Sequence, residues 1–304
     1  MGDRAFASAT ELSDEIRDRH IGCVELLDFY LARAERHNPA LNAIVVWQVD
    51  QARERARAAD AALARGERWG PLHGISMTVK ESFNVAGLPT TFGNPLWKDN
   101  IATGNAFMID RLLQAGAIIF GKTNVPYMLA DAQSYNDIYG TTNNPWDPTR
   151  SPGGSSGGEA ATLAAGLSAL GAGSDIAGSL RNPAHYSGVY GHKPTWGLIS
   201  TRGHAPPGIM TPTDTYPWSA PWRATPRTSI WRCALLPDPT CCSGPPGGSR
   251  CRRRATVGSA SFASPCGHRL RYAGSTVASL TSLIAPSMPS CVLERWSTMQ
   301  HDPG

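Results

Sequence analysis

The stretch that decides the fold is Gly74-Ile75-Ser76-Met77-Thr78-Val79-Lys80, which reads as a β-strand ending on a lysine. Apolar and polar side chains alternate along it, which is the pattern of a strand with two different faces. A second stretch, Ala117-Ile118-Ile119-Phe120-Gly121, is apolar and follows a predicted helix over residues 105–115. Such a run is typical of a buried parallel strand. Helices that alternate with buried strands predict an α/β domain.

Further elements are expected on both sides of these strands. The spacing of Ser8 and Glu11 is that of a capping box and predicts the start of a helix. Apolar residues from Val24 onward recur at helical spacing, and this second helix is expected to end at Asn38-Pro39. The other expected elements are helices over 48–66 and 159–167, a strand over 169–174, and loops over 140–158 and 175–183.

Composition divides the chain into two parts. The 304 residues carry a formal charge of +4, but residues 216–304 contain 10 arginines, no lysine and 3 acidic residues. Six of the 7 cysteines also lie in this part. We therefore predict an α/β domain over residues 1–212 and an aberrant tail over residues 213–304 that is disordered or poorly packed. The arginine and cysteine clusters of the tail lack the spacing of a nucleic-acid arm, a disulfide framework or a zinc site.

The first part of the chain has the features of a cytoplasmic protein. No secretory signal follows Met1, and no apolar run approaches the ~18–20 residues needed to span a bilayer. Its one cysteine, Cys23, fits a reducing compartment. Residues 1–215 contain no His-x-x-x-His or Cys-x-x-Cys pattern, so no metal is expected. We expect neither nucleic acid nor membrane as a partner.

The most distinctive loop is Gly153-Gly154-Ser155-Ser156-Gly157-Gly158. A flexible linker has this composition, but the segment lies inside a well-patterned α/β region. A phosphate-binding P-loop would end in Gly-Lys-Ser or Gly-Lys-Thr, which is absent here. The loop also fits Gly-x-Ser-x-Gly around Ser156, but a nucleophile elbow needs a strand directly before it. The proline-containing residues 144–148 cannot supply that strand.

Ser155 precedes Ser179 by 24 residues, and Lys80 stands upstream at the end of a strand. With the motifs around these residues, the chain resembles the amidase signature family over residues 8–212. The resemblance implies a mixed α/β sheet flanked by helices. The shared motifs are Gly70-Pro71-Leu72-His73-Gly74, Val79-Lys80-Glu81, Ala86-Gly87-Leu88-Pro89-Thr90-Thr91, Gly121-Lys122-Thr123-Asn124, Asn144-Pro145-Trp146-Asp147, the two serine loops, and Gly191-His192-Lys193-Pro194-Thr195-Trp196-Gly197.

The resemblance also implies roles for individual residues. Lys80 would be the general base, Ser155 the relay on a cis peptide, and Ser179 the nucleophile. Backbone N–H groups would form the oxyanion hole, and no cofactor would be needed. A serine hydroxyl needs a base, and a lysine with an ordinary pKa near ~10.4 can serve only if burial favours its neutral form. The residues expected to supply the N–H groups are Ile176, Ala177, Gly178 and Ser179.

Two residues depart from the family pattern. Ala177 stands where the family usually has glycine, so its φ must be negative for its N–H to serve as an oxyanion donor. Glu81 stands where the family usually has aspartate, a change we expect to be tolerated. Spacing alone also leaves open a serine–histidine pair, because three histidines lie near the motifs: His73, His185 and His192.

The sequence therefore predicts an amidase that hydrolyses the C–N bond of a small amide through an acyl-enzyme. A glutaminase similar to the A component of glutamyl-tRNA amidotransferase is an alternative within the family. A catalytically inactive, truncated or frameshifted product is the alternative from another class. Regrouping the codons of residues 228–240 in the next frame permits an amphipathic helix ending at Gly-Pro, so we hypothesise a frameshift between residues 213 and 228. The gene's nucleotide sequence tests this hypothesis.

Overall fold

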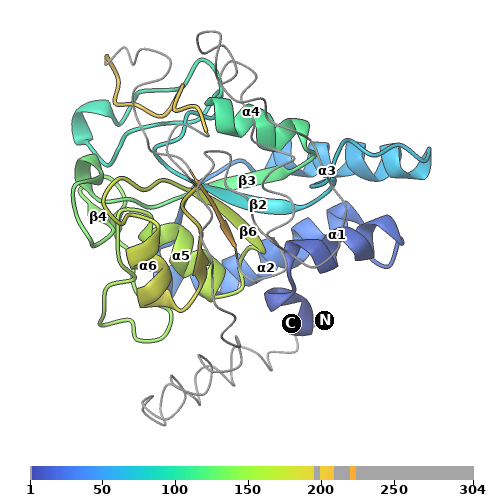
Figure 1. Cartoon of the computed structure of the whole chain (residues 1–304), viewed down its shortest axis with the longest axis horizontal. Helices are drawn as coiled ribbons and strands as arrows, with labels where there is room; N and C mark the ends of the chain where they lie inside the picture. The colour runs from blue at the N-terminus through green and yellow to red at the C-terminus, as the bar shows by residue number, and fades with distance from the viewer. Residues whose placement is uncertain (1, 195–198, 209–219, 224–304) are drawn as a thin grey trace, which may run out of the picture.

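A computed structural model describes residues 2–194, 199–208 and 220–223, which form a mixed sheet flanked by helices (Figure 1). The sheet has six strands in the order β1-β3-β2-β6-β8-β7. β2 is parallel to β3 and β6, whereas β1, β8 and β7 are antiparallel to their neighbours. The strands are β1 (Ile44–Trp47), β2 (Ser76–Lys80), β3 (Ile118–Thr123), β6 (Leu170–Gly173), β7 (Tyr190–Gly191) and β8 (Ala220–Arg223). The predicted α/β class is confirmed.

Helices cover both faces of the sheet. In Figure 1, α4 lies above the central strands, and α2 and α5 lie below them. A short antiparallel pair, β4 (Tyr135–Asn136) and β5 (Gly140–Thr141), forms a separate sheet. The α-helices are α1 (Ala9–Arg17), α2 (Cys23–Leu41), α3 (Val49–Ala64), α4 (Phe107–Gln114), α5 (Gly157–Ala164) and α6 (Arg181–Ser187), and the 3-10 turns are η1 (Gly2–Phe6), η2 (Pro95–Trp97) and η3 (Tyr127–Leu129).

The start of α1 and the end of α2 test the sequence predictions. The capping box at α1 is confirmed: Ser8 Oγ accepts the Glu11 N–H at 3.1 Å, and Glu11 Oε2 accepts the Ser8 N–H at 2.8 Å. The predicted end of α2 is wrong, because the helix continues through Pro39 to Leu41. The Asn38 side chain accepts the N–H groups that follow the helix, at 2.9 Å each, and so closes the end one turn later.

Further differences from prediction concern short elements. The predicted loop 175–183 contains the start of α6, and the predicted loop 140–158 contains β5 and the start of α5. β1 was not predicted. Within the predicted tail, residues 220–223 form β8 along β6. This pairing satisfies backbone groups at an otherwise open edge. Residues 213–219 and 224–304 lie outside the described residues, and the proposed frameshift remains a prediction.

β2 is buried on both of its faces, although one face is polar. α5 packs against that face, where Glu159 of α5 contacts Thr78 of β2. A buried polar face requires hydrogen-bond partners, and this requirement brings the chemistry of the chain to β2. No helix in the described part of the chain is long and apolar enough to cross a membrane.

Candidate active site

The ends of the three parallel strands place the predicted lysine and its neighbours together. Lys80 is the last residue of β2, Thr123 is the last residue of β3, and Ser174 directly follows β6. The carboxyl ends of adjacent parallel strands form a common edge, which is where open α/β sheets hold their functional groups. The loop at 153–156 and the loop at 175–180 meet at this edge, because the Ser156 N–H donates to the Ser179 carbonyl at 3.1 Å.

Lys80 is completely buried and lies against two serine hydroxyls. Its Nζ is 2.7 Å from Ser155 Oγ and 2.8 Å from Ser174 Oγ. Burial lowers the pKa of Lys80 to about 7, while Asp175, Glu159 and Glu81 act in the opposite direction. An amine with this pKa is available as a base near neutral pH. The structure therefore brings together two of the three predicted catalytic residues.

The glycine-serine loop is fixed by contacts from outside it. The Gly154–Ser155 peptide is cis. The Ser134 hydroxyl accepts the Gly157 N–H at 2.9 Å and donates to the Gly153 carbonyl at 3.2 Å. A Cβ on Gly154 would lie 2.5 Å from a backbone oxygen of the neighbouring segment, so only glycine fits there. These contacts hold Ser155 in place at Lys80.

Ser156 is a buried link between the two loops and not a nucleophile at an elbow. Besides its N–H bond to Ser179, its hydroxyl is 3.2 Å from the Ser174 carbonyl and accepts the Ser174 N–H at 3.4 Å. No strand directly precedes it in the described structure. Ser156 therefore connects the predicted relay loop, the predicted nucleophile loop and one of the two serines that contact Lys80.

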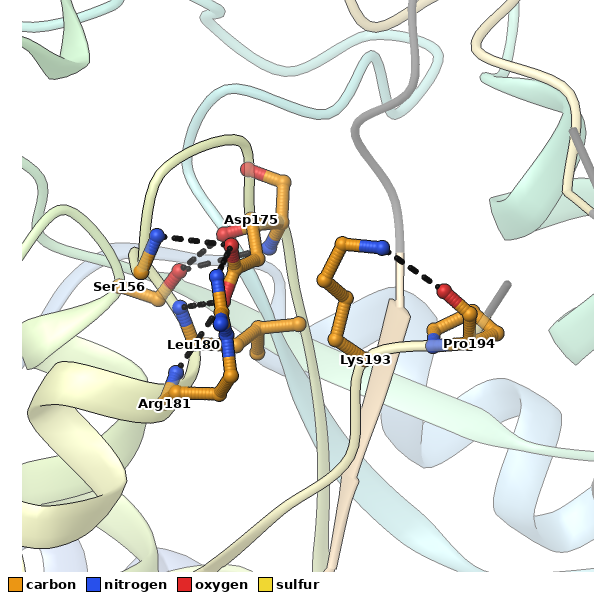
Figure 2. A network of polar contacts seen from close by, with 8 residues as sticks. Ser156, Asp175, Leu180, Arg181, Lys193 and Pro194 are labelled. Carbon is orange, nitrogen blue, oxygen red and sulfur yellow. Dashed lines mark hydrogen bonds and ion pairs between the residues drawn. The ribbon is translucent and has the colours of Figure 1, made fainter. Parts of the chain in front are cut away.

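Asp175 organises the loop that carries Ser179. In Figure 2 the backbone N–H groups of Leu180 and Arg181 point toward its carboxylate, at 3.1 and 3.3 Å. The Arg181 guanidinium adds two bonds of 3.0 Å. Burial of Asp175 opposes ionisation, but the hydrogen bonds from Arg181, Gly178 and Leu180 outweigh it, and the pKa lies below its usual value. Figure 2 also shows Lys193 donating to the Pro194 carbonyl, away from this carboxylate.

The predicted oxyanion donors differ from one another in the structure. The N–H of Gly178 donates to Asp175 Oδ1 at 2.8 Å, so in this conformation it is used within the loop. Within the described residues, the N–H groups of Ile176, Ala177 and Ser179 have no hydrogen-bond partner. The φ of Ala177 is not positive, which is the condition that an alanine must meet here. In this part of the chain, three of the four expected donors are therefore free.

Ser179 is half-buried at the rim of the site. Among the residues that the structure describes, no hydrogen bond joins its hydroxyl to Ser155 or Lys80. Catalytic hydrogen bonds are often long in structures without substrate and shorten when substrate binds. The geometry leaves the loop of Ser179 fixed to the loop of Ser155 through Ser156.

Two of the three histidines that left a serine–histidine pair open, His73 and His185, have other partners. His73 contacts the Trp69 N–H and the Ala59 carbonyl, each at 3.2 Å, and His185 contacts the ring of Tyr186. A histidine that sequence reasoning did not select, His204, is 2.9 Å from the hydroxyl of Ser82. Its burial lowers its pKa to about 3.

Two residues near Lys80 were also not selected from the sequence, Ser174 and Glu159. Ser174 ends a predicted strand, and Glu159 opens a predicted helix, so both positions have an ordinary structural explanation. Their proximity to Lys80 depends on the parallel alignment of β2 and β6 and on the packing of α5, which local pattern does not encode. The signal that could have found Ser174 is its place at the carboxyl end of a predicted parallel strand.

Comparisons with known proteins agree on one family. The sequence profile described as Amidase matches residues 25–215. An acylamidase from Rhodococcus erythropolis is 44% identical over 194 residues, covering 64% of this chain and 41% of its own. A fatty-acid amide hydrolase 2 from Homo sapiens is 39% identical over 207 residues, covering 66% of this chain and 39% of its own.

The solved structures give the same result. A bacterial aryl acylamidase belonging to the amidase signature enzymes has a TM-score of 0.70 and 28% identity, and the match covers 76% of this chain and 48% of that one. The chain spans about two fifths of the length of the curated relatives that it matches.

Proposed function

This chain belongs to the amidase family, and from that premise we propose that it hydrolyses the C–N bond of a carboxylic amide to an acid and an amine or ammonia. The reaction would proceed through an acyl-enzyme on Ser179. The observation that carries the proposal is the 2.7 Å contact between the buried Lys80 amine and the Ser155 hydroxyl. Among the described residues this amine contacts hydroxyls and no carboxylate, which suits a buried lysine to act as a base.

In the acylation step, Lys80 takes the proton of Ser155 while Ser155 takes the proton of Ser179. Ser179 Oγ then bonds to the carbonyl carbon of the amide, and the carbonyl oxygen becomes an oxyanion. The free N–H groups of Ile176, Ala177 and Ser179 are the donors for that oxyanion. Each such donor typically contributes ~3–4 kcal/mol of transition-state stabilisation.

The departing nitrogen must be protonated before it leaves, because an amine anion is a poor leaving group. The proton held by Lys80 returns through Ser155 to that nitrogen, the C–N bond breaks, and the acyl group remains on Ser179. Water then attacks the ester with Ser155 and Lys80 again as the proton acceptors. The acid is released and the hydroxyl of Ser179 is restored.

The test uses the full 304-residue chain with a simple aryl amide, beside Ser179→Ala and Lys80→Met. We expect turnover that both substitutions abolish, with a cooperative melt in all three proteins. A folded wild-type chain without serine-dependent turnover would contradict the proposal and favour the inactive product.

Glutamine is offered in parallel, because the relatives include a glutamyl-tRNA(Gln) amidotransferase component from Azoarcus sp. (strain BH72), 43% identical over 197 residues. That match covers 65% of this chain and 40% of the relative. Release of ammonia from glutamine, without hydrolysis of the aryl amide, would favour the glutaminase alternative. Activity in the cytoplasm remains part of the proposal.

A further inference from the structure

Three buried carboxyl groups act electrostatically on Lys80: Asp175, Glu159 and Glu81. Their hydrogen-bond partners differ in kind. Asp175 accepts three backbone N–H groups and the Arg181 guanidinium. Glu81 accepts the N–H groups of Thr91 at 2.6 Å and Phe92 at 3.1 Å. N–H donors of this kind stabilise a carboxylate in a buried site.

Glu159 has no such donor within the described residues. It lies in the first turn of α5 and is completely buried. In this part of the chain its two oxygens are hydrogen-bonded only to threonine hydroxyls, with Oε1 2.5 Å from Thr78 Oγ1 and Oε2 2.8 Å from Thr123 Oγ1. A Cβ on Gly171 of β6 would overlap the carboxyl group, so that group packs directly against the strand. Burying a charged carboxylate among hydroxyls alone is strongly unfavourable.

The hydroxyls around Glu159 can satisfy a protonated carboxyl group completely. Thr123 Oγ1 is also 3.4 Å from the Val79 carbonyl, so its hydrogen has a second acceptor. Thr123 can then accept the carboxyl proton at Oε2 while Thr78 donates to Oε1. Each donor and each hydroxyl hydrogen in this arrangement has a partner. Burial also raises the pKa of Glu159 to about 8, against the opposing effect of Thr78, Thr123 and Lys80.

The charge of Glu159 would affect Lys80 directly. Thr78 and Lys80 lie two residues apart on the same face of β2, which separates them by ~7 Å. An ionised carboxylate at about this distance raises the pKa of an amine by ~1–2 units. Of the other groups that face Lys80, Asp175 and Glu81 have N–H donors, and burial lowers the pKa of His204 to about 3, so that it is neutral. Whether Glu159 is protonated therefore decides whether the Lys80 amine has a further negative charge nearby.

We propose that Glu159 is a positioning residue that works as a neutral carboxylic acid, joining β2 to β3 beneath Lys80 and leaving the amine free to act as a base. The inference rests on the proposed function, in which Lys80 is that base. It concerns a role that the catalytic steps above do not use. The proton on Glu159 does not enter the reaction, and the residue acts only through Lys80.

The first experiment compares Glu159→Leu with Glu159→Gln in the full chain. The leucine variant leaves Thr78 and Thr123 without their partner, and kcat should fall ~10-fold. The glutamine variant is neutral and can both donate and accept, so it should restore most of the loss with the same acid limb in the pH profile. A glutamine variant as slow as the leucine variant overturns the proposal. If the apparent pKa of the acid limb is lower by about one unit in Glu159→Gln than in the wild type, the proposal is also overturned. Such a shift means that Glu159 is ionised in the wild type.

The second experiment reads the carboxyl group directly. Infrared difference spectra of wild type against Glu159→Gln at neutral pH should contain the carbonyl band of one protonated carboxyl group. The matched control is Glu67→Gln, at an exposed residue paired with Arg65. The difference spectrum of wild type against this control should lack the band of a protonated carboxyl group. If Glu159→Gln does not fold, wild-type chain with carbon-13 glutamate serves instead, because its isotope shift identifies a protonated glutamate. Carboxylate bands alone would overturn the proposal.

A separate measurement distinguishes this inference from the proposed function. A fluorophosphonate probe labels an activated serine without an amide substrate, so its rate against pH reports Ser179 activation. If the wild type is not labelled at any pH, the proposed function fails, while the infrared spectra still test the state of Glu159. If labelling is normal and the infrared band is absent, the function stands and the role of Glu159 as a neutral acid fails.

Discussion

Replacing Ser174 with alanine should slow the reaction by disturbing the orientation of Lys80. The neutral amine has two hydrogens and one lone pair, and it needs that lone pair to face the Ser155 hydroxyl. Ser174 Oγ, at 2.8 Å from Nζ, is the acceptor that takes one of the hydrogens. Ser174→Ala removes it and leaves a completely buried donor without that partner.

The expected size of the effect follows from the cost of that unpaired donor. An unsatisfied buried donor costs ~1–3 kcal/mol, which corresponds to a ~5–150-fold fall in kcat if the cost is borne in the transition state. KM should change little, because Ser174 is almost completely buried. The effect should be smaller than that of Lys80→Met, which removes the base.

The assay is steady-state hydrolysis of an aryl amide, with the melting temperature measured on the same preparations. The matched control is Ser168→Ala, since Ser168 is also buried and its hydroxyl donates to the Leu170 carbonyl at 2.6 Å. We expect both variants to lose stability, but only Ser174→Ala to lose kcat. Equal kcat in the two variants would refute the assignment of Ser174 to the orientation of the amine.

Four more predictions concern the site and its support. The reactive form of Lys80 is neutral and its pKa is about 7, so kcat/KM should fall ~10-fold per pH unit below that value. Since unfolded lysine binds its proton up to pH 10.5, the contribution of Lys80 to stability should also decrease as the pH falls from there toward 7, which unfolding curves across this range would measure. Asp175→Asn places an amide group against N–H donors and should lower kcat more than ~10-fold, whereas the half-buried control Asp147→Asn should not. Gly171→Ala should lower the free energy of unfolding by ~1–3 kcal/mol through overlap with a buried side chain, and Gly104→Ala, which meets no atom within 4 Å, should not.

Local sequence signals predicted the fold where one residue or one period decides the structure. The capping box at Ser8 and the buried parallel strand at 118–123 are of this kind. The end of α2 was mispredicted because the restriction imposed by Pro39 competes with the side chain of Asn38, which closes the helix beyond it. The start of α6 was read as loop because the N–H groups of its N-cap, Leu180, and of its first residue, Arg181, are satisfied by Asp175, a residue outside the helix.

The sequence predicted those site residues that lie within contiguous motifs. Lys80 and Ser155 meet as the resemblance implied, although 75 residues separate them in sequence. Ser174 could not be assigned a role, because its contact with the lysine depends on β6 lying beside β2. The hydrogen bond from the Gly178 N–H to Asp175 could not be predicted from the sequence either, because it depends on the direction of one peptide group in a loop.

The bond from the Ser156 N–H to the Ser179 carbonyl has a consequence for how the site can change with evolution. It joins main-chain atoms, so no side-chain substitution at either position removes its donor or acceptor, apart from proline at 156. Insertions or deletions in either loop would break the alignment of the two peptide groups. Side-chain substitutions at the two positions therefore leave this bond in place, while the lengths of the two loops are constrained as a pair.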